Sequence, residues 1–484
     1  MSTNTIQREA VQTTSSPPTA PAPESAQVEE LNRWGRAFPY YSRELFRLFR
    51  MHVAQESSVL EVGSQLGDLL ASLQPSHGVG IEPRPDVAAA ARLRHPHLTF
   101  VEADPASFDL NGETFDIVIV STVLGEARDV QAVFRSIRAA CRPDTRVIIA
   151  YHNAVWEPIL KLASAVGLRR PVDKQNWLSM QDLTNLAYLA DLEVIRKSAE
   201  VLLPLAIPLL SAVFNRFLVR FWPWPAFGLI QLLIVKPVAP PDLPNPRVSV
   251  IIPTRNERGN IEAAVARTPE MGSGTEIIFV DGNSTDGTQD EIQRQIARCP
   301  DRDMKYIPQG DGVGKGDAVR KGFAAATGDV LMILDADLTV PPEALPRFVD
   351  AIVRGKGEFI NGTRLVYPME DEAMRFLNKC GNRFFSTLFT WLLNQPIRDT
   401  LCGTKVLTKA NYDVIARNRH YFGEFDPFGD FDLILGAAKA NFKITEVPVR
   451  YGARSYGTTN ISRFRHGWLL LKMSWVAFRR LKLR

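Results

Sequence analysis

The sequence predicts an α/β protein with two doubly wound domains, in which helices cover both faces of mainly parallel sheets. Two segments, residues 58–150 and 248–364, alternate short apolar strands with helix-favouring stretches, and this alternation is typical of parallel sheets. Between them, residues 236–246 (KPVAPPDLPNP) contain five prolines, which make a semi-rigid spacer. A chain of 484 residues has room for two or three domains.

The first half of the chain is expected to hold five strands in a parallel sheet. We expect them within residues 58–62, 78–82, 98–104, 114–120 and 146–150. Residues 86–93 are rich in alanine, which favours a helix between two of these strands.

Residues 201–235 are rich in Leu, Pro, Phe and Trp, and prolines and arginines interrupt the apolar runs. Because no uncharged stretch of 18 residues remains, we exclude a simple transmembrane helix here. Two interpretations stay open. The segment is either a helical cap that leads into a last strand at 229–235, or a membrane-facing surface or acceptor-pocket wall, and we favour the cap.

The first expected strand ends in a glycine-containing turn, residues 61–67 (EVGSQLG), and the second ends in Glu82. This arrangement resembles the class I S-adenosylmethionine-dependent methyltransferases, whose fold is Rossmann-like. The resemblance implies that Gly63 and Gly67 let the backbone approach the cofactor. It also implies that Glu82 accepts the ribose hydroxyls and that Asp104 lies near the adenine. Glu61, which opens the motif, is included among the cofactor-binding residues.

Two positions depart from that family's pattern. Gln65 stands where relatives have a glycine, and Thr122 stands where relatives often have an aspartate. Three outcomes therefore stay open: an active methyltransferase, a domain that binds the cofactor without turnover, and a degenerate scaffold. We expect the active enzyme. A generic dinucleotide site is disfavoured because the G-x-G-x-x-G spacing is absent.

In the second half, a strongly apolar strand, residues 331–337 (LMILDAD), ends in Asp335 and Asp337. Two like charges this close are unfavourable without a positive partner, and hard divalent cations prefer carboxylate oxygens. The alternative is a pair of surface aspartates in a turn.

Three other blocks place polar residues after an apolar strand or at the start of a helix. They are residues 248–257 (VSVIIPTRNE), 276–288 (EIIFVDGNSTDGT) and 314–318 (GKGDA). Ligands bind at the carboxyl ends of the strands in open α/β sheets, so we expect these residues to share one edge.

The order of these four blocks resembles glycosyltransferase family 2, which has the GT-A fold, and in particular its dolichol-phosphate mannose synthase branch. The resemblance covers residues 246–465 and implies a nucleotide-sugar donor, an inverting transfer and a bound Mg²⁺ or Mn²⁺. It assigns the donor to Pro253, Arg255, Glu257, Asp281, Asp286, Lys315 and Asp335. It assigns the metal to Asp335 and Asp337.

A metal held by Asp337 would neutralise the departing diphosphate without needing a proton. Lys315, between two glycines, and Arg364, after the next strand, are expected to add positive charge near the phosphates. The alternative for each of these two cations is a solvated surface charge.

An inverting transfer to a hydroxyl needs a base, whereas a phosphate acceptor is already an anion. The first candidate base is Asp399 in residues 399–405 (DTLCGTK), a block that resembles the family's acceptor motif. Asp430 and Asp432 are the next candidates. The alternative for all three is a structural loop carboxylate.

Residues 454–460 (RSYGTTN) resemble the family's C-terminal lid. Asn460 is neutral where relatives often place a Lys or Arg, so either Arg454 or Arg463 contacts the diphosphate or the lid contributes less. Asn283 likewise stands where an aspartate is common, which leaves the number of metal ions open.

The amino-acid composition restricts the classes of partner and the compartment that we expect. The net charge of +4 carries no strong nucleic-acid signature, so we expect no nucleic-acid partner. The four cysteines lack C-x-x-C spacing, which disfavours a zinc site and indicates a reducing compartment. No signal peptide is visible, so we expect a cytoplasmic protein.

The C-terminal residues 463–484 mix Trp, Leu and Phe with Arg and Lys, as a basic amphipathic helix does. Such a helix can lie on the inner face of an anionic membrane. The alternative is a helix packed on the transferase domain with a solvated basic end. Membrane contact would favour a polyprenyl-phosphate acceptor over a glycan or a small molecule.

We therefore expect an inverting, metal-dependent glycosyltransferase fused to an S-adenosylmethionine-dependent methyltransferase. The rival hypotheses are a single-activity glycosyltransferase with a degenerate methyltransferase scaffold, and a non-catalytic protein that binds nucleotide sugars. The expected parts are a disordered segment (1–28), a methyltransferase-like domain (29–236), the linker (237–246), a glycosyltransferase domain (247–462) and the C-terminal helix (463–484).

Overall fold

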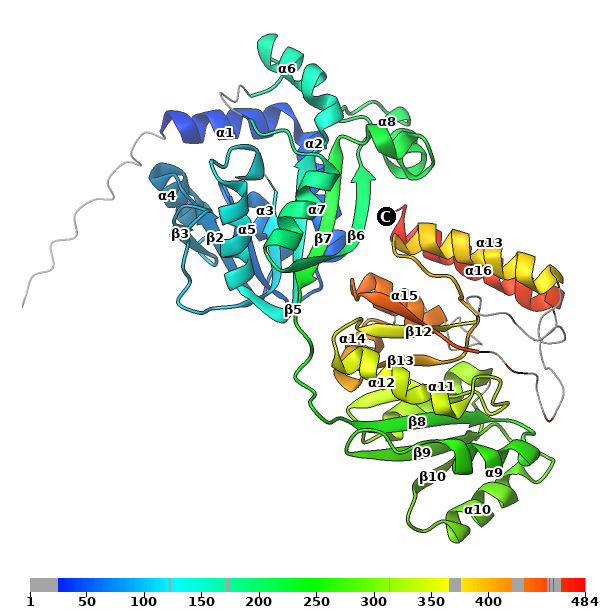
Figure 1. Ribbon diagram of the computed structural model, residues 1–484. Coiled ribbons are helices and arrows are strands. Elements are labelled where there is room, and N and C mark those ends of the chain that lie inside the picture. The colour runs from blue at the N-terminus through cyan, green and yellow to red at the C-terminus, as the bar shows by residue number, and fades with distance from the viewer. Residues whose placement is uncertain are drawn as a thin grey trace, which may run out of the picture.

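Each half of the chain folds around its own seven-stranded mixed sheet, and a linker joins the halves (Figure 1). The fold class predicted from the sequence, two doubly wound α/β domains, is confirmed. The computed structural model describes residues 25–121, 123–170, 175–312, 314–364, 376–419, 431–450, 452, 456 and 463–483.

The first sheet has the strand order β3-β2-β1-β4-β5-β7-β6. Its strands are β1 (Ser58–Val62), β2 (His77–Glu82), β3 (Thr99–Glu102), β4 (Phe115–Val120), β5 (Cys141–His152), β6 (Leu192–Glu200) and β7 (Ile230–Pro237). The first five strands are parallel, and β7 runs antiparallel between β5 and β6. The chain order reverses between β1 and β4, and ligands of doubly wound sheets bind where this happens.

Eight helices are described in this half. They are α1 (Ala26–Ala37), α2 (Pro39–His52), α3 (Asp68–Leu73), α4 (Pro85–Arg94), α5 (Val130–Ala139), α6 (Glu157–Ala165), α7 (Met180–Leu189) and α8 (Leu210–Ala212). Helix α1 begins three residues before the predicted domain start, because Ser25 caps it by accepting from the Val28 N–H (3.3 Å).

The second sheet has the order β10-β9-β8-β11-β13-β12-β14, and β13 is antiparallel to both of its neighbours. Its strands are β8 (Arg247–Thr254), β9 (Gly274–Asp281), β10 (Asp303–Pro308), β11 (Val330–Ile333), β12 (Phe359–Thr363), β13 (Lys405–Thr408) and β14 (Ile444–Pro448). Its helices are α9 (Arg258–Arg267), α10 (Thr288–Arg298), α11 (Gly314–Ala325), α12 (Leu345–Val353), α13 (Phe376–Leu393), α14 (Lys409–Arg417), α15 (Phe431–Lys439) and α16 (Arg463–Leu481).

The two halves contact each other directly through buried groups. Arg146 of β5 donates to a carboxylate oxygen of Glu358 in the second half (2.6 Å), and the Arg146 side chain is 6% exposed. Trp391 of α13 donates its indole N–H to the Arg220 carbonyl (2.7 Å) and stacks on Phe221, with 5.3 Å between ring centroids. The linker is therefore not the only connection between the sheets.

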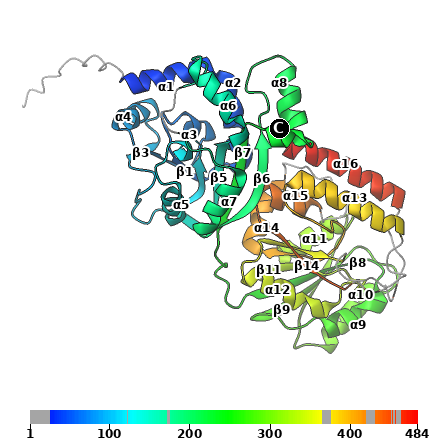
Figure 2. The same cartoon turned by 45° about the horizontal axis from the view of Figure 1, so that its top comes forward.

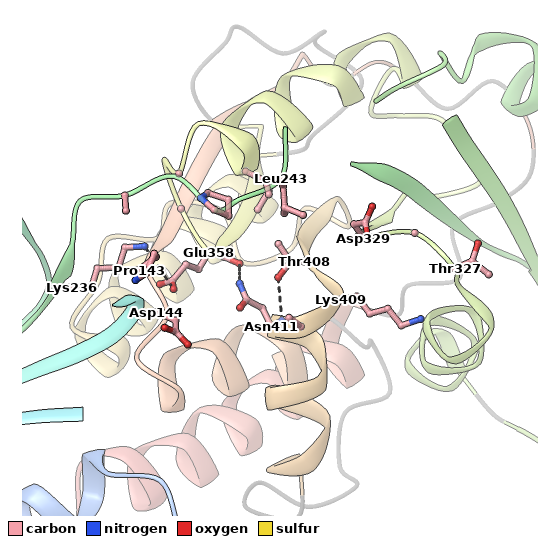
Figure 3. Close-up of a pocket in the computed structure, with 17 residues that line it drawn as sticks. Pro143, Asp144, Lys236, Leu243, Thr327, Asp329, Glu358, Thr408, Lys409 and Asn411 are labelled. Atoms are coloured by element: carbon pink, nitrogen blue, oxygen red, sulfur yellow. Dashed lines mark hydrogen bonds and ion pairs between the residues drawn. The ribbon is translucent and has the colours of Figure 1, made fainter. Parts of the chain in front are cut away.

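A cavity of about 370 Å³ lies beside the linker at this joint (Figure 3). In Figure 3 the Asn411 side chain points towards Glu358, to whose carbonyl it donates (3.0 Å). Asp329 also lines the cavity and directly precedes β11, so the cavity lies at the amino end of that strand. Residues 335–337 follow the other end of the same strand, and the cavity is thus separate from the expected donor site.

Among the helices that the structure describes, none combines the length and the apolar character that crossing a membrane requires. Between residues 201 and 229 the structure has α8 and short helical turns, which lead into β7.

Candidate active sites

The expected donor-binding residues of the second half follow strands that end at one edge of the sheet. Strands β8, β9 and β11 are parallel neighbours, and β9 ends at Asp281 while β11 ends at Ile333. Pro253 is half-buried near the end of β8, and Arg255 is exposed just beyond it. The strand ends thus bring these residues towards residues 335–337, as the sequence pattern predicts.

Hydrogen bonds tie the loop after β8 to the loop after β9. The side-chain oxygen of Asn256 accepts from the Thr285 N–H (2.9 Å), and the Asn256 N–H donates to the Ser284 hydroxyl (2.9 Å). Ser284 in turn donates to the buried Asp281 carboxylate (2.5 Å). Asn256 has a left-handed backbone (φ 58°), which asparagine tolerates better than most residues. Asp281 therefore organises the loop around the expected nucleotide position.

Asp286 and Glu257 have structural partners at this edge. One oxygen of Asp286 accepts from the Arg258 N–H (3.2 Å) and the other from the Thr288 N–H (3.0 Å), so Asp286 caps the starts of α9 and α10. Glu257 is buried and accepts from the Asn260 side chain (2.7 Å). These contacts stabilise the loops at this edge of the sheet. They do not favour the predicted direct contact of Asp286 with the donor.

Lys315 at the start of α11 forms an ion pair with Asp335 (2.6 Å), and the two side chains are 26% and 32% exposed. Burial alone would raise the pKa of Asp335. The charge of Lys315 and its hydrogen bond, together with the more distant Lys405 and Arg364, outweigh burial and lower this pKa below its ordinary value. Asp335 is therefore an ionised carboxylate at neutral pH, and the predicted proximity of Lys315 to the carboxylate pair is present in the structure.

Gly403 is a residue of this site that the sequence reasoning did not single out. A Cβ atom at this position would lie 1.9 Å from a carboxylate oxygen of Asp335, so the close approach requires glycine. Lys405, two residues on, is fully buried, donates to the Cys402 carbonyl and helps to lower the pKa of Asp335. The only signal in the sequence was the resemblance of residues 399–405 to an acceptor motif.

Asp337 is half-buried and accepts from the Thr339 hydroxyl (2.8 Å) and from the Thr339 N–H (3.2 Å). Between these two residues, Leu338 has a left-handed backbone (φ 52°), which is uncommon for a leucine. Strained backbone of this kind costs about 1–3 kcal/mol and is concentrated at functional sites. The turn therefore fixes the positions of both carboxylates after β11.

The donor set at this turn fits a hard divalent cation only in part. Among the described residues, no group of three or more His, Cys, Asp or Glu side chains is placed to hold a metal. Asp335 and Asp337 supply a carboxylate pair, and Mg²⁺ commonly binds through one or two carboxylates plus substrate phosphates. Asp335 and Asp337 therefore fit a metal ion that binds together with a diphosphate. They do not form a complete metal site by themselves.

Arg364 and Asp399 form a buried bidentate ion pair. The guanidinium donates to both carboxylate oxygens (2.6 and 2.8 Å), and the N–H groups of Arg364 and Leu401 donate to the same carboxylate (3.1 and 3.0 Å). Asp399 is 0% exposed. This burial disfavours Asp399 as the catalytic base, because a base must be reachable by the acceptor, and that role stays a prediction. The geometry indicates that Asp399 positions Arg364.

The other two candidate bases are placed differently. Asp432 is buried and pairs with Arg419 (2.9 Å), which agrees with the structural alternative. Asp430 lies outside the described residues. So do Arg454 and Asn460 of the expected lid, and Thr122 of the methyltransferase pattern.

In the first half, the turn after β1 has the expected shape. Gly63 (φ 83°) and Gly67 (φ 77°) both adopt left-handed backbone, and Gln65 between them does so as well (φ 50°). A Cβ at Gly67 would lie 2.4 Å from the Phe100 ring, so packing also requires glycine there. The departure at Gln65 thus puts a full side chain at a position that favours glycine.

The Glu82 carboxylate is 1% exposed and already fully engaged. It accepts from the Gln65 N–H (2.9 Å) and from the Arg84 guanidinium at both oxygens (2.6 and 3.2 Å). A ribose that replaced these contacts would have to displace Arg84. The position of Glu82 at the end of β2 agrees with the predicted role, whereas its present partner competes with that role.

Glu61 lies in β1 directly before this turn, and Asp104 follows β3, which is two strands away in the sheet order. Burial raises the pKa of Glu61 to about 8, although the Leu70 N–H (3.1 Å) stabilises the carboxylate. Glu61 therefore anchors the start of α3. Asp104 is exposed after β3 and accepts from the Ala106 N–H (2.9 Å), which leaves it accessible to a ligand.

Tyr41 and His152 form a pair that the sequence reasoning missed. The Tyr41 hydroxyl and a ring nitrogen of His152 are 2.9 Å apart, at the end of β5. Burial, with the charge of Arg169, lowers the pKa of His152 to about 4, so the imidazole is neutral at pH 7. The two residues are 111 positions apart, and no local pattern connects them.

Comparison with known proteins matches both halves. Residues 249–412 match the family model described as "Glycosyl transferase family 2", and residues 33–197 match a model described as "Methyltransferase domain". Both resemblances stated from the sequence are confirmed.

Curated relatives match the second half. A "Dolichol-phosphate mannosyltransferase" of Pyrococcus furiosus is 32% identical over 222 residues, which are 44% of this chain and 59% of that protein. "Glycosyltransferase AglJ" of Haloferax volcanii is 29% identical over 231 residues, which are 47% of this chain and 71% of that protein. The chain thus spans less than two thirds of the length of the Pyrococcus relative.

Solved structures resemble each half at low identity. Glucosyl-3-phosphoglycerate synthase from Mycobacterium tuberculosis, in complex with Mn²⁺, UDP and glucosyl-3-phosphoglycerate, is 17% identical. The match covers 49% of this chain and 81% of that one, with a TM-score of 0.36. A S-adenosylmethionine-dependent methyltransferase from Thermotoga maritima is 15% identical over 43% of this chain and 95% of that one, also with a TM-score of 0.36.

Proposed function

We propose that this chain transfers a sugar from a nucleotide-diphosphate sugar to a polyprenyl phosphate, with inversion of the anomeric centre. In the chain, the methyltransferase domain comes first and the family 2 glycosyltransferase domain follows it. The observation that carries the proposal is the Lys315–Asp335 ion pair beside Asp337 at the common edge of β8, β9 and β11. It provides two carboxylates and a cation where the diphosphate of a donor would lie.

In this proposal Asp335 and Asp337 hold Mg²⁺ or Mn²⁺ together with the donor diphosphate. When bound, the metal supplies positive charge that stabilises the departing diphosphate. Lys315 adds charge at the same place, and its ammonium passes from Asp335 to a phosphate oxygen when the donor binds. Arg364 is held in place by its ion pair with Asp399, and its positive charge helps to lower the pKa of Asp335.

The state of the candidate bases favours a phosphate acceptor over a hydroxyl. Of the carboxylates named as bases and described in the structure, Asp399 and Asp432 are both buried in ion pairs with arginines. A phosphate monoester attacks as an anion and needs no proton acceptor. A glycan or small-molecule hydroxyl would need a base, and it remains the alternative acceptor class.

The donor test is a thermal-shift panel of nucleotide sugars on the full chain, with and without Mn²⁺, followed by a transfer assay to a polyprenyl phosphate. Asp337→Asn should lower kcat/KM about 100-fold or more while leaving the unfolding temperature in the absence of ligand unchanged. The control is Asp290→Asn on the first turn of α10, which should behave as the wild type. Full turnover of Asp337→Asn would contradict the metal assignment.

For the first half we propose binding of S-adenosylmethionine at Glu61, Gly63, Gly67, Glu82 and Asp104. The rival, a degenerate scaffold, is motivated by the left-handed Gln65 and by the Arg84–Glu82 pair. Calorimetric titration of the full chain with S-adenosylmethionine separates the two. Binding in the micromolar range supports the cofactor site, and absence of heat at millimolar cofactor supports the scaffold.

We also propose that the protein works at the inner, cytoplasmic face of the cell membrane and contacts it peripherally through α16. The exposed face of α16 carries Trp468, Leu471 and Trp475, spaced as one helical stripe, while Met473 and Phe478 pack inward. Trp side chains are enriched at membrane–water interfaces.

A further inference from the structure

The methyltransferase half exposes apolar side chains over two segments that do not belong to either candidate site. Helix α6 has no buried residue, although it is mostly apolar. The exposed large side chains of this first segment are Val155, Ile159, Leu162, Val166 and Leu168. Isolated exposed apolar residues are ordinary, but a contiguous patch indicates a binding surface.

The second segment, residues 205–227, exposes a larger number of apolar side chains. Its exposed large side chains are Leu205, Ile207, Leu209, Leu210, Val213, Phe217, Phe221, Trp222, Trp224 and Phe227. Trp222 is 91% exposed and Leu209 is 85% exposed. Leu209 also has a positive φ (62°), a backbone conformation that is uncommon for a leucine and costs energy.

Aromatic contacts join this segment to the helices of the second half. Phe217 meets Phe478 of α16 edge to face, with 6.5 Å between ring centroids, and Phe221 stacks on Trp391 of α13. In Figures 1 and 2, α8 lies between α6 and the C-terminal end of α16 on one flank of the molecule. Residues 155–168, residues 205–227 and the exposed face of α16 therefore form one surface, here named the apolar flank.

The apolar flank carries an excess of positive charge. Residues 155–168, 205–227 and 463–484 together contain ten Arg and Lys residues, of which Arg220 and Lys482 are buried, and one acidic residue, Glu157. The whole chain, by comparison, has 57 basic and 53 acidic residues. Arg216 and Arg479 are exposed beside the apolar side chains. The basic side chains match the anionic headgroups of a bilayer, and the exposed Trp, Phe and Leu side chains match the acyl boundary beneath them.

We infer that the apolar flank docks on an anionic lipid bilayer, so that the methyltransferase half binds the membrane together with α16. The inference rests on the proposed function, in which the acceptor is a lipid phosphate. A second copy of the chain fits the surface less well, because a two-fold interface would place the same excess of positive charge on both sides. Docking in the plane of the interface needs no membrane-crossing helix.

The test is flotation of the full chain with vesicles of phosphatidylcholine alone and with 30% phosphatidylserine. The double variant Leu209→Ser, Trp222→Ser changes two highly exposed side chains, so the fold should be kept. The wild type should float with the anionic vesicles, and the double variant should bind about tenfold more weakly or worse. The matched control is Leu93→Ser, Tyr188→Ser, two exposed apolar residues of α4 and α7 off the flank, which should bind as the wild type.

Equal binding of the wild type and the Leu209→Ser, Trp222→Ser variant would overturn the inference, as would equal binding to both vesicle types. Light scattering without lipid tests the rival occupant: a dimer that this variant dissociates would assign the flank to a second copy.

Transfer to a short-chain polyprenyl phosphate in detergent separates the docking proposal from the proposed function. If the wild type and the variant are equally active there, the proposed function stands whatever the flotation shows. If the wild type is inactive there, the proposed function fails, and flotation alone decides the docking.

Discussion

Gly403 shows how a residue without a side chain can determine a site. Its backbone lies against the carboxylate of Asp335, which is also paired with Lys315. Sequence reasoning identified Asp335, Asp337 and Lys315 because charged residues at strand ends stand out in an apolar pattern. A glycine that is required by a contact with a residue 68 positions earlier leaves no such pattern, and only the folded chain reveals it.

Gly403→Ala should therefore displace the Asp335 carboxylate, because a Cβ atom 1.9 Å from its oxygen cannot be accommodated in place. We expect kcat/KM for sugar transfer to fall at least about tenfold with the fold retained. The measurement is steady-state kinetics beside circular dichroism. Gly35→Ala, where a Cβ would meet no atom within 4 Å, is the control and should have wild-type kinetics.

Lys315→Gln should shift the pH dependence of donor binding. Burial raises the pKa of Asp335, and Lys315 is the largest influence that lowers it, so removing this lysine should raise the pKa. A lowered pKa in the folded state stabilises the protein above the unfolded pKa, and this contribution is lost as the pH falls through the folded pKa. In Lys315→Gln the loss of Mn²⁺-dependent donor binding on acidification should begin at a higher pH than in the wild type. Identical acid limbs in binding titrations would contradict this assignment.

At the scale of elements, the sequence indicated the strands that form long apolar runs and missed those stabilised by distant partners. β6 (Leu192–Glu200) carries charged and polar residues because it lies at a sheet edge, and its strand character comes from pairing with β7. β13 is only four residues long, and its antiparallel place between β11 and β12 depends on long-range pairing. The pairing of Asp399 with Arg364 was missed for the same reason, since the two residues lie 35 positions apart.

The Arg364–Asp399 pair joins the end of β12 to the loop before β13, and breaking it should destabilise the second half. Arg364→Met leaves a fully buried carboxylate without its cation, which costs about 3–5 kcal/mol in comparable cases. The double variant Arg364→Met, Asp399→Leu should recover most of that stability, because no buried charge is left unpaired. Urea denaturation measures both. Equal stability of the single variant and the wild type would mean that the pair is hydrated in solution.

At the scale of the whole molecule, the order of the two halves and the linker could be inferred from the sequence, and their contact could not. The joint consists of pairings such as Arg146 with Glu358, which are 212 positions apart. Nothing in the local sequence distinguishes these residues from solvated charges. The proline-rich linker suggested two separate bodies, whereas the structure buries polar and aromatic groups between them.

Glu358→Ala should weaken this joint, because Arg146 would remain 6% exposed without its carboxylate. We expect a loss of about 3 kcal/mol or more and a single thermal transition that separates into two. Differential scanning calorimetry is the measurement. Glu343→Ala removes the exposed partner of Arg267 and should cost less than about 1 kcal/mol. An unchanged thermogram for Glu358→Ala would show that the joint contributes little to cooperativity.

The joint also limits how the two proposed reactions can be coupled. With Arg146, Trp391 and Phe221 packed between the halves, neither half can swing a bound intermediate across to the other. A product made at one half could reach the other only by leaving and rebinding. If that product is anchored in a lipid leaflet, its search for the second site is confined to the two dimensions of that leaflet. Retention on the membrane then takes the place of direct transfer between the sites.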